Sequence, residues 1–217
     1  MSRRLSRALP ALLAAVLGAT LLAGCAAPAD PGYATIHPIG SSSPYRGVAI
    51  DPPYQLPRAT WTDTAGNKVS WPADGLPQLV TVLFLGYTNC PDVCPTQLAD
   101  ITSAIRGAPP AVRSKVGLEF ITVDPRRDDA KTLRAYLDRF DPSYAGLRSD
   151  DVPMLKRAAT SLGVAMTGSS DTVTGYEVGH GGQLIAFGAD GTAPVIWTPG
   201  TPVADIRADL TTLVGQA

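Results

Sequence analysis

The sequence is poor in the residues that build large metal sites. Its 217 residues include three cysteines, two histidines and three methionines. A four-cysteine zinc site therefore needs more cysteines than the chain has, and the chain has no cluster of methionines or histidines. Any metal site must be small and must combine the few sulfur and imidazole groups that are present.

The sequence also lacks an excess of charge of either sign. It has 18 basic and 19 acidic residues, which gives a net charge of −1, and charged residues make up 17% of the chain. A nucleic-acid-binding protein needs a basic face, so this balance argues against a nucleic-acid partner. The hydrophobic fraction of 45% is ordinary for a globular protein, and no internal repeat is present.

Residues 1–24 have the pattern of an export signal. Three arginines near the start precede an apolar run rich in Leu and Ala, which ends in Leu22-Ala23-Gly24-Cys25. This ending resembles a bacterial lipoprotein signal, in which Cys25 becomes the lipid-bearing first residue. We therefore expect a protein anchored by lipid to the extracytoplasmic face of the cell membrane. Removing the leader leaves 15 basic and 19 acidic residues, a net charge of −4.

The remainder divides into a tether and one folded domain. Residues 25–47 contain four prolines and three consecutive serines with little periodic apolar content, which is typical of a flexible linker, and His37 lies within it. Residues 48–217 are enough for one well-packed core. Once Cys25 is set aside, the two remaining cysteines belong to one short motif in a chain that is sent to an oxidising compartment.

That motif, GYTNCPDVCP at residues 86–95, lies between a strand and a helix. The apolar, β-branched run at 79–85 predicts a buried strand, and the spacing of Leu98, Ile101 and Ile105 predicts a helix from Pro95 to about Arg106. In an α/β sheet, ligands bind at such a corner. The partial positive charge of the helix N-terminus is expected to lower the pKa of a thiol there.

The other elements predict an α/β sandwich around a central mixed sheet. The expected order is a hairpin at 56–71, the strand at 79–86 with its helix, a strand at 117–123, a helix at about 128–140, a third helix capped by Ser149 or Asp150, a polar loop at 168–175, a hairpin at 183–197 and a last helix from Thr201-Pro202. A strand, a helix and a further strand in succession indicate a right-handed parallel crossover.

Cys90 and Cys94 are the first candidates for chemistry. Residues four apart on a helix have Cβ atoms about 5–6 Å apart, which suits two sulfurs that bind one metal ion. A disulfide needs Cβ atoms about 3.8 Å apart, and it could form if Cys90 lies in the loop before the helix. A five-residue loop gains little from a purely structural disulfide.

His180 and Asp124 are further candidates. His180 is the one histidine of the folded domain, and the glycines around it leave room for its ring to point into a site, although a lone histidine is more often solvated or packed. Two thiolates and one imidazole suit copper in both oxidation states. Asp124 ends the strand that follows the cysteine strand, where it either orients a ligand or takes part in the turn and the helix cap, which is the role we favour.

The motif at 86–95, together with FITVDPRRD at 120–128 and the segment 176–180, strongly resembles the Sco/SenC family over essentially the whole folded domain. The resemblance implies a thioredoxin-like fold with an inserted hairpin and a membrane-anchored copper chaperone. Such a chaperone delivers one copper ion to the copper-receiving subunit of cytochrome c oxidase, which holds its binuclear centre. It also implies that Cys90, Cys94 and His180 bind the copper. Family members usually carry Asp directly before this histidine, whereas this chain has Gly179.

Two other activities remain open at this stage. In a thiol-disulfide reductase, one of Cys90 and Cys94 would attack a disulfide of the oxidase subunit or of another exported protein, and the other would resolve the intermediate. A thioredoxin-like reductant would then be a further partner. A peroxidase would need the same layout of cysteines, but no residue specifically supports peroxide activation.

Overall fold

We analysed a computed structural model of the chain, which describes residues 35–36, 43–170, 177–179 and 181–217. The chain separates into two units, Met1–Tyr33 and Ala34–Ala217. The first unit, with the expected export signal and Cys25, lies outside the described residues, as do His37 and His180. No helix of the described residues is long and apolar enough to cross a membrane.

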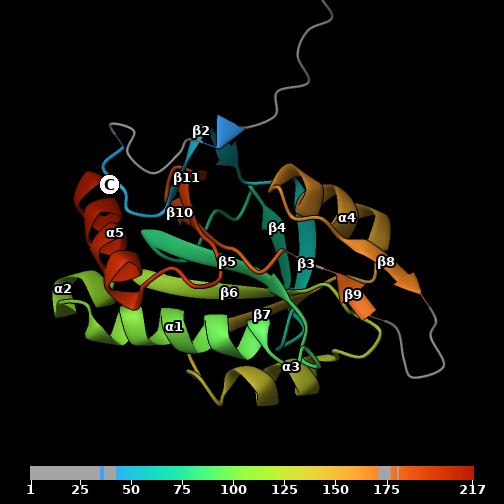
Figure 1. The fold of residues 1–217 in the computed structure, drawn as a ribbon. Coiled ribbons are helices and arrows are strands. Elements are labelled where there is room, and N and C mark those ends of the chain that lie inside the picture. The colour runs from blue at the N-terminus through green and yellow to red at the C-terminus, as the bar shows by residue number, and fades with distance from the viewer. Residues whose placement is uncertain (1–34, 37–42, 171–176, 180) are drawn as a thin grey trace, which may run out of the picture. The chain divides into compact units, whose positions relative to one another are not determined.

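The unit from Ala34 onward begins with strands, continues with helices and strands in the middle of the chain, and ends with further strands and a last helix (Figure 1). The strands are β1 Thr35–Ile36, β2 Val48–Gln55, β3 Ala59–Asp63, β4 Lys68–Trp71, β5 Val80–Gly86, β6 Val116–Thr122, β7 Ala145–Arg148, β8 Thr167–Ser170, β9 Glu177–Gly179, β10 Leu184–Gly188 and β11 Thr192–Trp197. The helices are α1 Val93–Gly107, α2 Pro110–Arg113, α3 Ala130–Leu137, α4 Val152–Ser161 and α5 Val203–Gln216.

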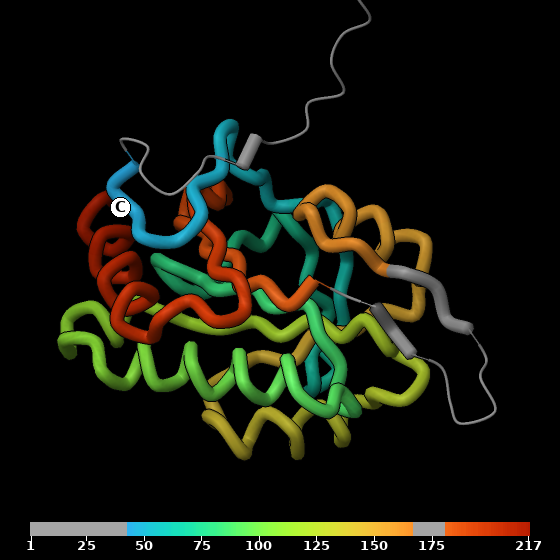
Figure 2. The backbone as a smooth tube through the Cα atoms, viewed as in Figure 1, coloured from blue at the N-terminus to red at the C-terminus, as the bar shows by residue number. Residues whose placement is uncertain are grey.

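A mixed sheet forms the centre of this unit. Its strand order is β1-β2-β11-β10-β5-β6-β7-β3-β4, and β8 pairs with β9 in a separate ribbon. The pairs β5–β6 and β6–β7 are parallel, while β10 runs antiparallel to β5. Figure 2 shows the C-terminal strand β10 beside β5, although more than ninety residues separate them along the chain. β5 therefore lies in the interior of the sheet, which explains why its sequence is apolar apart from Thr81.

Alternating residues of β5 fill two cores on opposite faces of the sheet. Val82 and Phe84 join one core, which α1, α3 and α5 cover. Leu83 and Leu85 join the second core, to which α4 and the β3–β4 hairpin contribute. The central mixed sheet and the flanking helices that the sequence predicts are confirmed.

The structure corrects several expected elements. β2 and β7 were not predicted, β1 falls inside the expected tether and pairs with β2, and β8 replaces the first part of the expected loop. The helix expected at about 128–140 is the shorter α3, and α1 begins at Val93 rather than at Pro95. Asp151, rather than Ser149 or Asp150, caps α4, because its side chain accepts the N–H of Met154.

A buried carboxylate of α5 anchors the chain at the start of the folded domain. Asp209 is 1% exposed and accepts hydrogen bonds from the N–H groups of Arg46 and Gly47, each at 2.8 Å. The indole N–H of Trp197 donates to the same carboxylate at 2.9 Å. These bonds attach residues 46–47 to the last helix, so the chain is held firmly just before β2 begins.

Glu119 makes the stability of the fold depend on pH. This β6 side chain is 4% exposed, its Oε2 has no hydrogen-bond partner among the described residues, and burial raises its pKa to about 7. Because the folded state then binds the proton more tightly than the unfolded chain, stability is full below the unfolded pKa and falls as pH rises toward 7. We expect a loss of roughly 2–3 kcal/mol between pH 4.5 and 7. Urea unfolding across this range should show the loss, and Glu119→Gln should remove it; an equal slope in both proteins would contradict the assignment.

Candidate metal centre

The two cysteines of the motif lie where β5 passes into α1. Neither takes part in a disulfide among the described residues; Cys90 is half-buried in the loop and Cys94 is buried in the first turn of the helix. Asp92 occupies the N-cap position, but its side chain makes no cap hydrogen bond. Instead the backbone N–H of Cys94 donates to Sγ of Cys90 at 3.3 Å. The first sulfur therefore occupies the place of a capping oxygen, directly beside the second cysteine.

The end of β5 is shaped to admit the buried sulfur. A Cβ placed on Gly86 would lie 2.9 Å from Sγ of Cys94 and 2.9 Å from the ring of Phe120, closer than real Cβ atoms approach such atoms. Only glycine therefore lets the first turn of α1 sit against the strand. Cys94 belongs to the core that includes Phe84, whose ring packs edge-on against Phe120 with centroids 5.6 Å apart.

The protonation of Cys94 differs from the expectation for a helix N-terminus. Burial is the largest effect and raises the pKa of the thiol well above its ordinary value, and the neighbouring Cys90 and Asp128 raise it further. A hydrogen bond with the backbone of Tyr87 acts in the opposite direction. The expectation of a lowered pKa was therefore wrong for Cys94, because removing the sulfur from water outweighs the helix dipole.

Asp128 fixes the loop that carries Cys90. Its carboxylate is fully buried and accepts the N–H of Thr88 at 3.0 Å, the hydroxyl of Thr88 at 2.6 Å and the hydroxyl of Thr122 at 2.6 Å. One side chain thus joins the motif loop to the end of β6. The sequence placed Asp128 at the start of a helix, where only Asp129 caps α3 by accepting the N–H of Thr132. The signal in the sequence that could have found Asp128 was its position shortly after β6, the strand that pairs with β5.

Asp124 reaches the motif indirectly. Its buried carboxylate forms an ion pair with Arg127, and its backbone oxygen accepts the N–H groups of Arg127 and Asp128. The guanidinium of Arg127 lies over the ring of Tyr87, 5.8 Å from the centroid. The backbone oxygen of Tyr87 in turn accepts the N–H of Cys90 at 3.3 Å. Asp124 therefore organises the turn after β6 and, through Arg127, supports the first residues of the motif.

The segment that follows His180 is fastened to the first turns of α1. The buried amide of Gln97 donates to the backbone oxygen of Gly182 at 2.7 Å. A Cβ on Gly182 would overlap the side chain of Val93, so the two residues are in close contact. Neither Gln97 nor Gly182 was singled out in the sequence, because a hydrogen bond across 85 residues leaves no local pattern.

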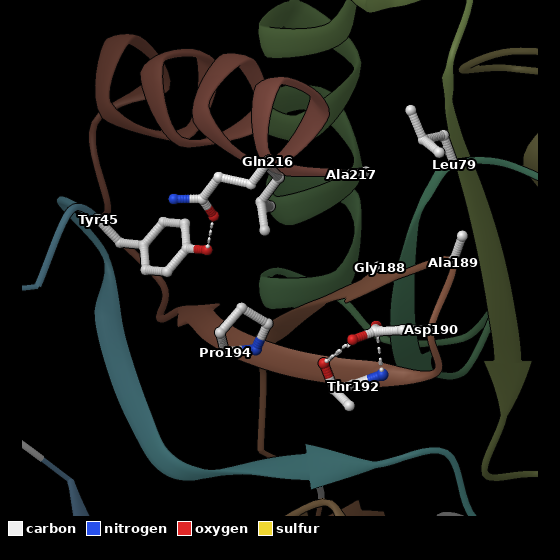
Figure 3. A pocket seen from close by; sticks show the side chains of 10 residues that line it. Tyr45, Leu79, Gly188, Ala189, Asp190, Thr192, Pro194, Gln216 and Ala217 are labelled. Carbon is white, nitrogen blue, oxygen red and sulfur yellow. Dashed lines mark hydrogen bonds between the residues drawn. The ribbon is translucent and has the colours of Figure 1, made fainter.

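Within the described part of the chain, no group of three or more His, Cys, Asp and Glu side chains is placed to hold a metal ion. The structure brings Cys90 and Cys94 together, whereas the third expected ligand lies outside the described residues. A separate hollow of about 390 Å³ lies between α5 and the β10–β11 turn. Figure 3 shows the hydroxyl of Tyr45 directed at Gln216 there, and the residues that line the hollow include neither cysteine nor histidine.

Solved structures of other proteins share this fold. The solution structure of apo Sco1 from Thermus thermophilus is 27% identical, with a TM-score of 0.68 over 80% of this chain and 99% of that chain. The structure of Bradyrhizobium japonicum ScoI with copper bound is 30% identical, with a TM-score of 0.60 over 71% of this chain and 96% of that chain. The sheet and its flanking helices thus form the thioredoxin-like fold of the Sco structures.

Comparison of sequences finds relatives with Sco names as well. The mitochondrial SCO2 homolog of Danio rerio is 34% identical over 113 residues, which are 51% of this chain and 40% of that protein. The chain spans about half the length of the curated relatives that it matches. The model of the SCO1/SenC family matches residues 49–215, from the start of β2 nearly to the end of α5. The chain therefore belongs to the SCO1/SenC family.

Proposed function

We propose that the protein binds one copper ion through Cys90, Cys94 and His180 and delivers it to the binuclear copper centre of cytochrome c oxidase. The observation that carries the proposal is the pair of cysteine thiols at the corner between β5 and α1, where the sulfur of Cys90 accepts the backbone N–H of Cys94. Two soft sulfur donors that lie close together suit Cu(I). The copper-bound relative from Bradyrhizobium japonicum is in accord with this cargo.

The anchoring of Gly182 supports the inclusion of His180. Gly182 is held against α1 by Gln97 and Val93, and two residues of chain span at most about 7 Å. This short stretch of chain between Gly182 and residue 180 supports the inclusion of His180 among the proposed ligands. Asp124, through Arg127, would support the loop that presents Cys90, as a positioning residue rather than a ligand.

The remaining parts of the chain would place this site at a membrane. We propose that residues 1–24 form the signal peptide, that Cys25 carries a lipid, and that residues 25–47 connect it to the domain at 48–217. A SCO1/SenC family lipoprotein is known from Bacillus anthracis. Such a tether would hold the copper site on the extracytoplasmic side, where the oxidase subunit accepts the ion by exchange of ligands.

Copper titration of the reduced full chain tests this proposal. We expect one tightly bound Cu(I), and we expect His180→Ala to weaken binding by at least about tenfold, since it removes one of three donors. His37→Ala is the matched control, because it removes the other histidine and should leave the affinity unchanged. A protein oxidised to the Cys90–Cys94 disulfide should lose tight binding. Equal affinity of the His180→Ala and His37→Ala variants would remove His180 from the site.

A thiol-disulfide reductase is the second candidate, and the unequal exposure of the two cysteines favours it. Half-buried Cys90 would attack a disulfide of the partner protein and form a mixed disulfide, releasing one thiolate. Buried Cys94 would then attack Sγ of Cys90, releasing the second thiolate and leaving the Cys90–Cys94 disulfide, so that two electrons pass to the partner. A thioredoxin-like reductant would restore the dithiol. Turnover on a model disulfide with that reductant, lost in Cys90→Ser, would establish this activity.

A further inference from the structure

Three arginines line one hollow at the end of α1 that lies far from the cysteines. Arg106 comes from the last turn of α1, Arg139 from the segment after α3, and Arg207 from α5, around a volume of about 560 Å³. Figure 1 shows this end of α1 beside α2 and α5. Arg106 lies about 18 Å along the helix from Cys94, given a rise of about 1.5 Å per residue. The hollow is therefore separate from the candidate metal centre.

Arg207 lacks the partner that a guanidinium in such a place normally has. No ion pair or hydrogen bond joins its guanidinium to the described residues, and its Nε is buried without a hydrogen-bond partner. Its guanidinium lies close against Gly107 of α1, where an added Cβ would be 2.5 Å from Nη2 and 2.6 Å from Cζ. Buried N–H donors are rarely left unpaired in folded proteins, so an acceptor from outside the chain is expected here.

The other two arginines are held in position, and only one of them pairs with a carboxylate of the described residues. Arg139 stacks on Tyr136 at 4.5 Å from the ring centroid, and its Nε donates to the Tyr136 backbone oxygen at 3.3 Å, but it pairs with no described carboxylate. Arg106 pairs with Asp141 at 3.3 Å. Three guanidinium groups thus share one carboxylate, which leaves a formal charge of +2 in a chain whose net charge is −1.

We propose that this hollow is a binding site for a phosphate group. A guanidinium presents its N–H donors as a fork that matches phosphate oxygens, and donors from three elements suit a tetrahedral anion better than a planar carboxylate. A terminal phosphate carries about −1.5 to −2 charges at pH 7, which balances the site, whereas a carboxylate carries one. The group would come either from a soluble phosphate or from the phosphomonoester headgroup of phosphatidic acid.

Isothermal titration of the full chain with inorganic phosphate at low ionic strength tests the site. We expect Arg207→Gln to weaken binding by at least about tenfold, because it removes the one guanidinium with no partner in the fold. Gly107→Ala keeps every charge but pushes the flexible Arg207 side chain away, and it should weaken binding to a similar extent. The matched control is Arg157→Gln, an exposed arginine of α4 on the other face of the sheet, which should leave the affinity within about twofold.

The same variants decide the source of the phosphate group. Capture of the protein by phosphatidic acid vesicles, lost in Arg207→Gln and Gly107→Ala but kept in Arg157→Gln, would support a lipid headgroup as the ligand. Saturable binding of inorganic phosphate without vesicle capture would support a soluble phosphate. Equal weakening in all three variants, absence of saturable phosphate binding, or tighter binding of a polyglutamate peptide than of phosphate would overturn the proposal.

Discussion

Serine in place of Cys94 should lower the Cu(I) affinity of the reduced protein by more than about a hundredfold. This exceeds the 10–100-fold that the loss of a supporting residue costs, because a hydroxyl does not replace a soft thiolate donor. Cys90→Ser should lower the affinity to the same extent. Competition with a Cu(I) chelator under reducing conditions measures both effects, and Cys25→Ser is the matched control because it removes the remaining cysteine.

The two variants should differ in the stability of the metal-free protein. Cys94 is fully buried against Gly86 and Phe120, so a hydroxyl there is expected to cost about 1–3 kcal/mol. Cys90→Ser puts a good capping oxygen where Sγ already accepts the N–H of Cys94, and stability should change little. Urea unfolding separates these results. If either serine variant kept one copper ion with an affinity near that of the parent protein, that cysteine would not be a ligand.

The sequence predicted best those elements whose burial follows from the pattern of their own residues. β5 is apolar apart from Thr81 because it is buried on both faces, and α1 repeats its apolar residues at helical spacing. Together they place both cysteines at the corner between β5 and α1 before any coordinates are known. The hairpin β10–β11 could be predicted equally well, since two apolar strands flank Asp190 and Gly191.

The missed elements depend on contacts that the local sequence does not contain. β2 includes Pro52 and Pro53, which are typical of a linker, yet it pairs with β11 on one side and with β1 on the other. β7 has four residues and is a strand because it extends the parallel pairing of β6. Its sequence alone is too short to show a period of two.

The same limit applies to the candidate site. The spacing of the two cysteines is visible in the sequence. The carboxylate that orders their loop belongs to Asp128, which lies 40 residues from its donor Thr88. Asp128 and Asp129 look alike in the sequence, as two acidic residues before a helix. Only the fold turns one toward the motif loop and leaves the other on the surface as the cap of α3.

Replacing Asp128 with alanine is therefore expected to have a much larger effect than the same change at Asp129. Asp128→Ala leaves three donors of Thr88 and Thr122 without their buried acceptor, and hydrogen bonds to a charged group are worth about 1.5–3 kcal/mol each. Because these bonds are not additive, we expect a loss of roughly 3–5 kcal/mol, a large part of the 5–15 kcal/mol typical of a domain. Asp129→Ala removes one exposed cap bond and should cost about 1 kcal/mol.

A loosened loop should also affect the proposed metal centre, since Thr88 lies two residues before Cys90. We expect Asp128→Ala to weaken Cu(I) binding by about 10–100-fold, as the loss of groups that orient metal ligands does, while Asp129→Ala leaves it unchanged. Asp128→Asn separates the two effects, because it keeps the shape of the side chain and one acceptor but turns a donor toward the threonines. Its losses should fall between those of the alanine variants. Equal stability and equal copper affinity in Asp128→Ala and Asp129→Ala would show that the buried carboxylate does not position the cysteine loop.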